Sequence, residues 1–555
     1  MKYFGWIFLF FIVMFIIPLA SRPMLGPWEF TEALPALEMI QNSSYAAVHN
    51  APVEPPMFHW ITAASYNLFG VNSFAARLPS ALAAGLTAAF IALLIRQHLR
   101  DEKLAALSAT VYISLLAVFF YGTVVSPVMF TVMAVSGSLG AIFLALQELK
   151  FNRRKFLLSV ISGLFAALAI LSDGIYAMLI PMIIALCYIV ISRKWKDLLF
   201  ITLPFLVCAA APTLPWALKF FSDPELLNEF FTFKSVSAPW YSYLVVIIIG
   251  LFPVWVLIPA SLMTGRESWK RLFNQPLCKF ACCAAVIPLV YAPAFRNVAP
   301  FAMQITFPAL AILTALGLQA YFNTGGHHRS FDWMLNLWAT LLVITGLAEV
   351  TLWFFPEFCE QYFALLPVKP VILLSLGVVS LLGGGTLLYS LHGNWRSRLY
   401  LFFFSVAILP LGFSWGIKGN TFMPESEFRM FIEALDIIPE KSLFYADENN
   451  IPALQWCTGE KINRIYCSCE IISTATENNI LVRRWNTDEK IDSFDCGCKI
   501  LPAASDKPTY IIIEKNIISK KSSALMKKIL LSTTEKRMLE GKNFVCFEIL
   551  PAKNK

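Results

Sequence analysis

The sequence predicts a mostly α-helical fold: a polytopic transmembrane helix bundle of about thirteen spans, with a long first outer loop and a small C-terminal α/β outer domain. The amino-acid composition supports the transmembrane part of this prediction. Of the 555 residues, 57% are hydrophobic and only 14% are charged, and the mean hydropathy is +0.64. A water-soluble globule covers its surface with charge, so the implied solvent is a lipid bilayer.

The apolar runs are long enough to cross a membrane. A helical span needs roughly 20 mainly apolar residues to cross about 30 Å of hydrocarbon. On this criterion we predict spans near residues 4–20, 79–95, 104–121, 128–146, 156–171, 175–192, 198–216, 242–263, 280–294, 299–321, 333–355, 369–391 and 399–417. Turns around Ser126 and Asp173 separate two pairs of these runs so tightly that hydropathy alone does not divide them.

Basic residues are distributed unevenly between alternate connections. With Met1 inside, 18 basic residues fall in the inner connections and 7 in the outer ones. The outer seven are Arg22, Arg77, Lys219, Lys234, Arg296, Lys369 and Lys418. This positive-inside bias predicts that the C-terminal tail lies outside. The short basic clusters between apolar runs also favour membrane anchoring over a nucleic-acid partner, so we predict no nucleic acid.

The first apolar run has a second interpretation. It follows a single Lys2, is short, and ends with Pro18-Leu19-Ala20, which loosely resembles a signal-peptide cleavage site. A retained span and a cleaved signal peptide therefore both remain open from these residues. We predict the span, because the family resemblance described below requires it.

The composition changes near Thr421 to that of a soluble domain. Helix-like stretches lie at residues 425–435 and 522–531, and β-like runs lie at 442–445 and 510–513. We therefore predict a transmembrane domain over residues 1–420 and a soluble extracytoplasmic α/β domain over residues 421–555.

Twelve cysteines divide evenly between the apolar region and the tail. Those in or beside spans are most simply small apolar packing residues. The tail carries Cys457, Cys467, Cys469, Cys496, Cys498 and Cys546. In an oxidising outer compartment, disulfides of undetermined pairing are the expected state. A metal site is the alternative, although the tail has no His and its Cys-x-Cys spacing is shorter than usual.

A segment between the first two spans, residues 21–78, is too polar and Pro-rich to cross the membrane. Long ordered loops are commonly functional. Glu29 and Glu32 lie three apart in a helix-like stretch and would share a face, where carboxylates suit proton abstraction or cation binding. A solvated helix face is the other interpretation. The run from Glu54 through His59 and Trp60 is also compatible with a plain interfacial anchor.

A series of motifs carries a family resemblance. It comprises the acidic first outer loop, the Pro55-Pro56 aromatic run, Phe69-Gly70, Ala76-Arg77-Leu78-Pro79-Ser80, Leu171-Ser172-Asp173-Gly174, Leu214-Pro215-Trp216, Tyr241 with Pro253 and Trp255, and Arg296 with Pro300 and Phe307-Pro308-Ala309-Leu310. With its motifs in this order along the sequence, the chain resembles the GT-C glycosyltransferases. Within them it most resembles the bacterial aminoarabinose transferase and protein O-mannosyltransferase group. The resemblance covers about residues 1–320 by motif and the remainder by layout.

The resemblance implies transfer of a sugar from a polyprenyl-phosphate carrier to a cell-envelope lipid, glycan or protein at the outer face, with inversion. It implies a bacterial inner-membrane protein. Glu29 is then the expected base, with Glu32 behind it, and Arg77 and Arg296 are the expected phosphate-binding cations. Arg77 could equally be a residue that snorkels to the interface. Glu54, His59, Trp60 and Asp173 complete the expected substrate-binding set, and no cofactor is certain.

Three residues depart from the pattern of this group. Relatives commonly have Lys where this chain has Glu54 and Asp173, and Asp where it has Ser126. Two cations have thus become anions, which weakens a phosphate site in a partly desolvated setting. Arg77 and Arg296 then carry the phosphate alone, or transfer activity has been lost, or, as a further hypothesis, Glu54 and Asp173 join Glu29 in binding a divalent cation. Two other function classes remain open: a catalytically silent relative that binds polyprenyl phosphate, and a lipid or sugar carrier.

Overall fold

The computed structural model describes residues 2–19, 24, 27–41, 55–150, 152–221, 239–262, 266–294, 300–323, 329–355, 370–390 and 394–418, and in the tail 424–434, 437, 443–446, 451–458, 463–464, 469–471, 482–484, 509–514, 536–540 and 544–549. The chain divides into two compact units. The first contains Met1–Arg22 and Pro35–Gly419, and the second contains Pro23–Leu34 and Asn420–Lys555. Helix α3 (Pro27–Gln41) is continuous across this division.

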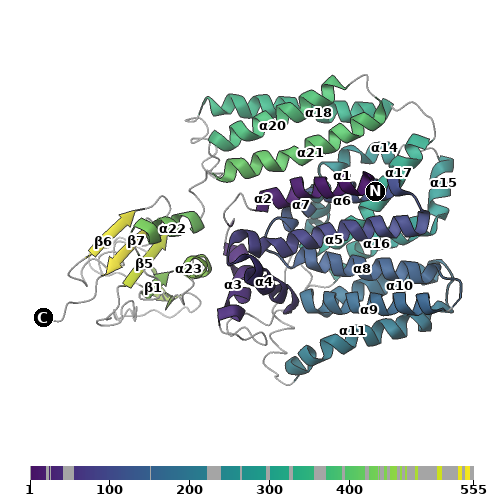
Figure 1. Ribbon diagram of the computed structural model, residues 1–555, viewed down its shortest axis with the longest axis horizontal. Helices are drawn as coiled ribbons and strands as arrows, with labels where there is room; N and C mark the ends of the chain where they lie inside the picture. Colours follow the sequence, from purple (N-terminus) through teal and green to yellow (C-terminus); the bar gives the residue numbers. More distant parts are fainter. Residues whose placement is uncertain are drawn as a thin grey trace. The chain divides into compact units, whose positions relative to one another are not determined.

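The first unit is helical (Figure 1). Its elements before residue 240 are α1 (Lys2–Phe11), η1 (Ile12–Ile16), α2 (Ile17–Leu19), α4 (Met57–Phe69), α5 (Ser73–Leu99), α6 (Glu102–Ile113), α7 (Leu116–Gly122), α8 (Val128–Gln147), α9 (Arg153–Asp173), α10 (Ile175–Ile191) and α11 (Asp197–Phe221). The later elements are α13 (Tyr241–Gly250), η2 (Val254–Val256), α14 (Ile258–Leu262), α15 (Arg266–Asn274), α16 (Pro276–Ala294), η3 (Pro300–Thr306), α17 (Phe307–Asn323), α18 (Arg329–Trp353), α20 (Pro370–Tyr389) and α21 (Trp395–Lys418).

Several helices of this unit can cross a membrane. In the described residues, six are long and apolar enough, and the number reaches eight if each of two bent helix pairs forms one span. The protein is therefore an integral membrane protein, and the predicted mostly helical, polytopic fold is confirmed. Each predicted span overlaps one or more helices, for example α8 for residues 128–146. The range 104–121, predicted as one run, is divided into α6 and α7, whose axes differ by 67°.

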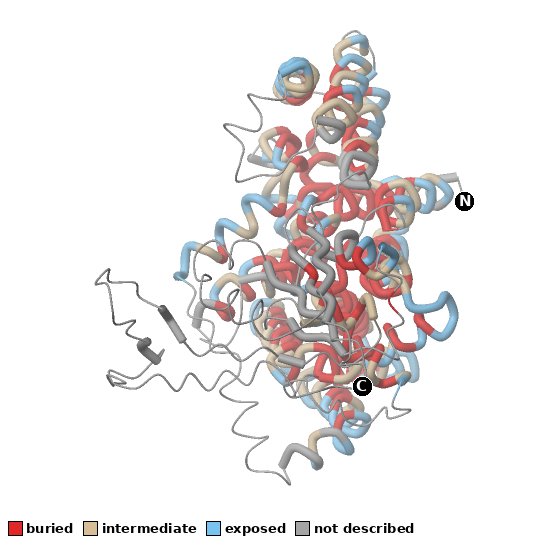
Figure 2. The backbone as a smooth tube through the Cα atoms, turned by 90° about the vertical axis from the view of Figure 1, so that its left-hand side faces the viewer, coloured by how far each residue is buried: buried red, intermediate tan, exposed pale blue. Residues whose placement is uncertain are grey.

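Helix α8 lies at the centre of the first unit. Of its most apolar window, 83% is buried, whereas the corresponding share is 22% for α11 and 28% for α18. Figure 2 shows buried residues gathered inside the molecule and exposed ones on its outer helices. Helices α11 and α18 therefore lie at the periphery, where apolar side chains meet lipid. Helix α8 packs against α5 and α9. The hydroxyls of Ser138 on α8 and Ser162 on α9 lie 2.9 Å apart and hydrogen-bond across that contact.

Glycines allow close helix contacts in the first unit. A Cβ atom at Gly163 of α9 would lie 2.5 Å from the carbonyl oxygen of Phe205 on α11. Between α18 and α20, a Cβ atom at Gly346 would lie 2.9 Å from the carbonyl oxygen of Gly377. Lipid tails are as apolar as the helices, so such close packing replaces the hydrophobic effect as the force that joins spans.

The second unit combines helices and a sheet. Its helices are α22 (Pro424–Ala434) and α23 (Ile451–Thr458), besides the start of α3. Its strands are β1 (Leu443–Ala446), β2 (Asn463–Arg464), β3 (Cys469–Ile471), β4 (Val482–Arg484), β5 (Thr509–Glu514), β6 (Lys536–Glu540) and β7 (Phe544–Ile549). The five-stranded sheet has the order β2-β1-β5-β7-β6. Strand β1 is parallel to β2 and β5, and β7 is antiparallel to β5 and β6. Strands β3 and β4 form a separate antiparallel pair.

The tail cysteines differ in part from the prediction. Cys457 in α23 and Cys546 in β7 are thiols, so the expected disulfides are not formed at these two positions. Cys546 is fully buried in its strand and packs as a small apolar residue. Cys467, Cys496 and Cys498 lie outside the described residues, and the side chain of Cys469 is not described.

Candidate functional site

Arg77 is fully buried near the start of helix α5. The helix begins at this point because Asn72 caps it: the Asn72 side-chain oxygen accepts a hydrogen bond from the Ala75 amide at 2.9 Å. The preceding Gly70 has φ of +76°, which reverses the chain between α4 and α5. A snorkelling arginine keeps its guanidinium in water or at the headgroups, so complete burial argues against the snorkelling interpretation of Arg77.

A tight turn before α8 is fastened to α5 one helical turn beyond Arg77. The Ser80 hydroxyl donates to the carbonyl oxygen of Ser126 at 3.0 Å and accepts from the Ser126 amide at 3.2 Å. The Ser126 hydroxyl in turn accepts from the amide of Val128 at 3.3 Å, at the start of α8. Residues 77, 80 and 126 are thereby fixed at one end of the bundle. The sequence offered Ser126 as a departure from the family pattern and Ser80 as part of a motif, but their contact required the fold.

We predict that Ser80→Ala lowers the free energy of unfolding by about 1–3 kcal/mol, because it leaves the buried Ser126 amide without a hydrogen-bond partner. Ser108→Ala is the matched control. The Ser108 hydroxyl is equally buried but donates only to the Leu104 carbonyl of its own helix. Denaturation of the purified protein in mixed micelles measures both variants. Equal losses of stability would contradict a special role for the Ser80 hydroxyl.

Helix α4 carries the predicted aromatic run. His59 is buried and its ring meets that of Phe58 edge to face at 5.9 Å, whereas Trp60 is 37% exposed. The Ser65 hydroxyl donates to the Ala75 carbonyl of α5 at 2.7 Å and so joins the two helices. Burial raises the pKa of the Tyr66 phenol well above its usual value, which keeps this group neutral. The Pro-Pro run thus leads into an ordered helix packed on α5, which is more than an interfacial anchor.

Asp173 is the last residue of α9, a helix that also contacts α4. Gly174, with φ of +85°, ends the helix and allows α10 to begin at Ile175. A carboxylate at a helix C-terminus adds to the negative end of the helix dipole, so a cation close to Asp173 is favoured. His59 and Trp60 thus lie on α4, and α4 contacts both the helix of Arg77, α5, and the helix of Asp173, α9.

The expected carboxylates of the first outer loop lie on α3. Glu29 is fully buried in the first turn of the helix, while Glu32, one turn later, is half-buried. A carboxylate near a helix N-terminus is stabilised in its charged form by the helix dipole. Both residues belong to the second compact unit, whereas Arg77, His59, Trp60 and Asp173 belong to the first.

Two expected site residues, Glu54 and Arg296, lie outside the described residues. The described part of the chain contains no group of three or more His, Cys, Asp or Glu side chains placed to hold a metal ion. The hypothesis of a divalent cation between Glu29, Glu54 and Asp173 stays a prediction, because Glu54 lies outside the described residues.

A buried amide was missed by the sequence prediction. Gln304 lies in η3 and is 1% exposed, and neither its side-chain oxygen nor its nitrogen has a hydrogen-bond partner among the described residues. Segment η3 contacts α8, α13 and α16. Two helical runs are broken in this part of the chain, one between α6 and α7 and the other between α13 and η2. A hydrogen bond from the Leu116 amide to the Phe252 carbonyl, at 2.7 Å, joins the two breaks. Non-helical backbone at membrane depth is tolerated where it is buried or lines a cavity. In the sequence, the sign of this buried amide was a single glutamine inside an otherwise apolar run.

Comparisons with known proteins show which proteins this chain is similar to. The family model described as dolichyl-phosphate-mannose-protein mannosyltransferase matches residues 53–218, which include α4, α5, α8 and α9. The structure matches that of ArnT from Cupriavidus metallidurans bound to undecaprenyl phosphate with a TM-score of 0.72, 18% identity and 98% of each chain covered. The chain therefore has the fold of this protein.

Curated relatives specify the resemblance further. The chain is 26% identical over 324 residues to the undecaprenyl phosphate-alpha-4-amino-4-deoxy-L-arabinose arabinosyl transferase 2 of Proteus mirabilis, covering 55% of this chain and 58% of that one. It is 27% identical over 331 residues to the corresponding transferase of Shewanella sediminis, covering 57% and 59%. The matches thus span less than two thirds of these relatives. The predicted resemblance to the GT-C glycosyltransferases, and within them to the aminoarabinose transferase and mannosyltransferase group, is confirmed.

Proposed function

We propose that this chain is an integral membrane glycosyltransferase that moves a sugar from a polyprenyl-phosphate carrier to an envelope lipid, glycan or protein at the outer face, with inversion. The observation that carries the proposal is the fully buried guanidinium of Arg77, which lies within the part of the chain that matches the family model. The planar donor fork of an arginine suits phosphate oxygens, and its charge persists at any physiological pH. The names of the curated relatives agree with an undecaprenyl-phosphate-linked donor.

The proposal assigns a physical task to each site residue. Glu29 deprotonates or orients the acceptor, with Glu32 behind it, while Arg77 and Arg296 stabilise the charge that develops on the phosphate leaving group. His59, Trp60, Glu54 and Asp173 position the donor and acceptor. The chain would cross the bacterial inner membrane about thirteen times, with the domain of residues 421–555 outside.

We expect Glu29→Gln to lower sugar transfer by about 10²-fold or more, because positioned proton transfer contributes typically 10²–10⁴-fold. The measurement is transfer from an undecaprenyl-phosphate sugar by purified protein, together with mass spectrometry of the retained lipid. Glu38→Gln is the matched control, since Glu38 lies on the same helix and is half-buried. Equal transfer by wild type and Glu29→Gln would refute the base assignment.

The same measurements separate the alternatives. Asp173, an anion where relatives have a cation, favours a catalytically silent relative as the second candidate. That candidate retains undecaprenyl phosphate in mass spectrometry but gives no transfer product with any envelope extract. Uptake of a lipid-linked sugar into proteoliposomes without a transfer product would instead indicate a carrier.

A further inference from the structure

Helix α15 (Arg266–Asn274) turns away from the span that follows it. The axes of residues 268–274 and 276–292 differ by 82°, with Gln275 between them. Figure 1 shows α15 at the right-hand end of the helix bundle, running across the direction of α16. Because α16 is apolar after Lys279 in its first turn and long enough to cross most of the hydrocarbon, α15 runs nearly parallel to the membrane surface.

One face of α15 is apolar and aromatic. Trp269, Leu272 and Phe273 have the spacing i, i+3 and i+4 and therefore share a face. Leu272 is buried against the bundle, while Phe273 is 49% exposed. The rings of Trp269 and Phe273 stack with centroids 5.3 Å apart, and the Trp269 indole N–H donates to the Leu262 carbonyl at 2.9 Å. Tryptophan is enriched at the membrane–water interface, where its amphipathic ring lies at the level of the headgroups.

The cations at α15 lack the acidic partners that Lys155, Arg154 and Arg96 have among the described residues. Lys270 and Arg271 are exposed, and Lys279 follows in the first turn of α16. None of the three forms an ion pair among the described residues. In contrast, Lys155 pairs with Asp197 at 2.6 Å, Arg154 with Glu148 at 3.2 Å and Arg96 with Glu102 at 3.8 Å. Residues 266–279 carry four basic residues and one acidic residue, Glu267, so this segment keeps a net positive charge that favours an external anion.

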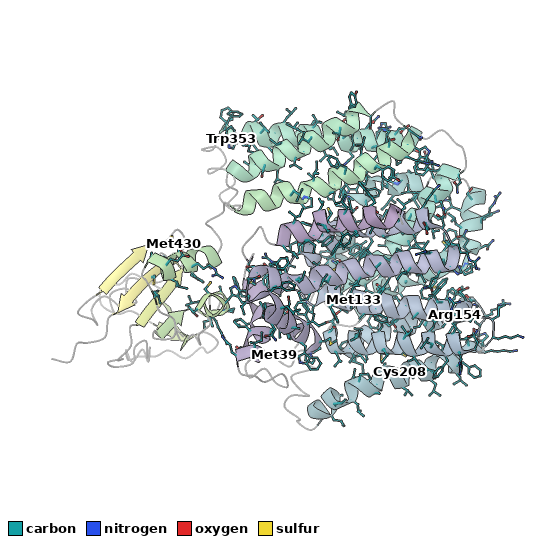
Figure 3. All side chains as sticks on the ribbon, in the orientation of Figure 1. Met39, Met133, Arg154, Cys208, Trp353 and Met430 are labelled. Carbon is teal, nitrogen blue, oxygen red and sulfur yellow. The ribbon has the colours of Figure 1, made fainter. Side chains whose placement is uncertain are left out.

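This surface is remote from the candidate site. Helix α15 contacts α17, and α17 is joined to the start of α6 by a hydrogen bond from Gln319 to Asp101 at 2.5 Å. Asp101 follows the end of α5, and Arg77 lies near its start. At 1.5 Å per residue, Arg77 and Leu99 are about 33 Å apart along α5. Arg154, labelled in Figure 3, projects from the same end of the bundle as α15. A phosphate bound at α15 is thus separate from one bound at Arg77.

We propose that α15 is a membrane-surface helix that binds the phosphate of an anionic bilayer phospholipid through Lys270, Arg271 and Lys279, with Trp269 and Phe273 inserted beside the glycerol backbone. Amphipathic helices with a basic polar face and an aromatic apolar face bind anionic membrane surfaces in this way. Each cation near an anionic surface strengthens binding about fivefold. The proposal concerns a structural lipid of the bilayer and does not depend on the proposed transfer reaction.

The test uses the purified full-length protein and counts bound dioleoylphosphatidylglycerol by native mass spectrometry during titration, with dioleoylphosphatidylcholine as the neutral reference. The variant Lys270→Gln/Arg271→Gln/Lys279→Gln is expected to bind phosphatidylglycerol at least tenfold more weakly and phosphatidylcholine unchanged. The control Lys103→Gln/Lys150→Gln/Arg153→Gln removes the same charge from exposed residues elsewhere in the unit and is expected to change the affinity less than twofold.

Three results would overturn the proposal. One is wild-type affinity in the α15 triple variant. Another is an equal loss in the control, which would show that only total charge matters. The third is displacement of phosphatidylglycerol by an equimolar amount of undecaprenyl phosphate, which would show that the bound phosphate belongs to a carrier site. If the α15 variant unfolds, Phe273→Ser supplies the test: it keeps every charge and is expected to weaken phosphatidylglycerol binding severalfold.

Discussion

Replacement of Arg77 by methionine is expected to reduce retention of undecaprenyl phosphate by about 10²-fold and sugar transfer by 10²–10³-fold. The loss of one buried, charged donor to a phosphate group removes a strong hydrogen bond in a site from which water is excluded. Arg77→Lys should recover part of the binding, because the charge remains while the planar fork is lost. Titration of undecaprenyl phosphate against the purified variants, with native mass spectrometry as readout, measures the effect.

A second buried arginine provides the control for Arg77. Arg398 on α21 is 2% exposed in its side chain but bonds to Asp332 and Asn336 of α18, within the protein. Arg398→Met removes an equal charge from an equally buried position. It should leave undecaprenyl phosphate binding per folded molecule within twofold of wild type. If folded Arg77→Met retains the lipid as wild type does, Arg77 is a structural residue and the phosphate site must be sought elsewhere.

Hydropathy located the helices but could not locate their breaks. The predicted span 128–146 agrees with α8, Val128–Gln147, within a residue at each end. The predicted span 104–121, in contrast, is broken between Ile113 and Leu116, where the sequence has neither Pro nor Gly. The break is stabilised by the hydrogen bond from the Leu116 amide to Phe252, more than a hundred residues away. Such a tertiary partner leaves no local signal.

The candidate site shows the same division between local and long-range information. Sequence alone singled out Arg77 and Asp173 because charges beside apolar runs are costly and therefore informative. It could not distinguish a snorkelling Arg77 from a buried one, since that depends on whether α4 and α8 cover the start of α5. It also missed Gln304, because a single amide changes the hydropathy of a span very little, although burying it without partners costs as much as a lost hydrogen bond.

The pair formed by Arg398 and Asp332 predicts an asymmetric loss of stability. The Arg398 side chain is 2% exposed, whereas that of Asp332 is 43% exposed. Asp332→Ala leaves a buried guanidinium with Asn336 as its remaining side-chain partner, and removing one member of a buried pair costs about 3–5 kcal/mol. Arg398→Met leaves a carboxylate that water can reach and replaces the buried charge by an apolar side chain of similar length. Its cost should be about 1 kcal/mol.

The double variant Asp332→Ala/Arg398→Met decides whether this account is correct. If the cost of Asp332→Ala arises from the stranded charge of Arg398, removing that charge as well should restore the stability to about that of Arg398→Met alone. The free energy of unfolding in mixed micelles, measured for the two single variants and the double variant, completes the cycle. Additive losses would mean that the two residues stabilise α18 and α21 independently. A larger loss for Arg398→Met than for Asp332→Ala would mean that the guanidinium contributes mainly through its packing between the helices.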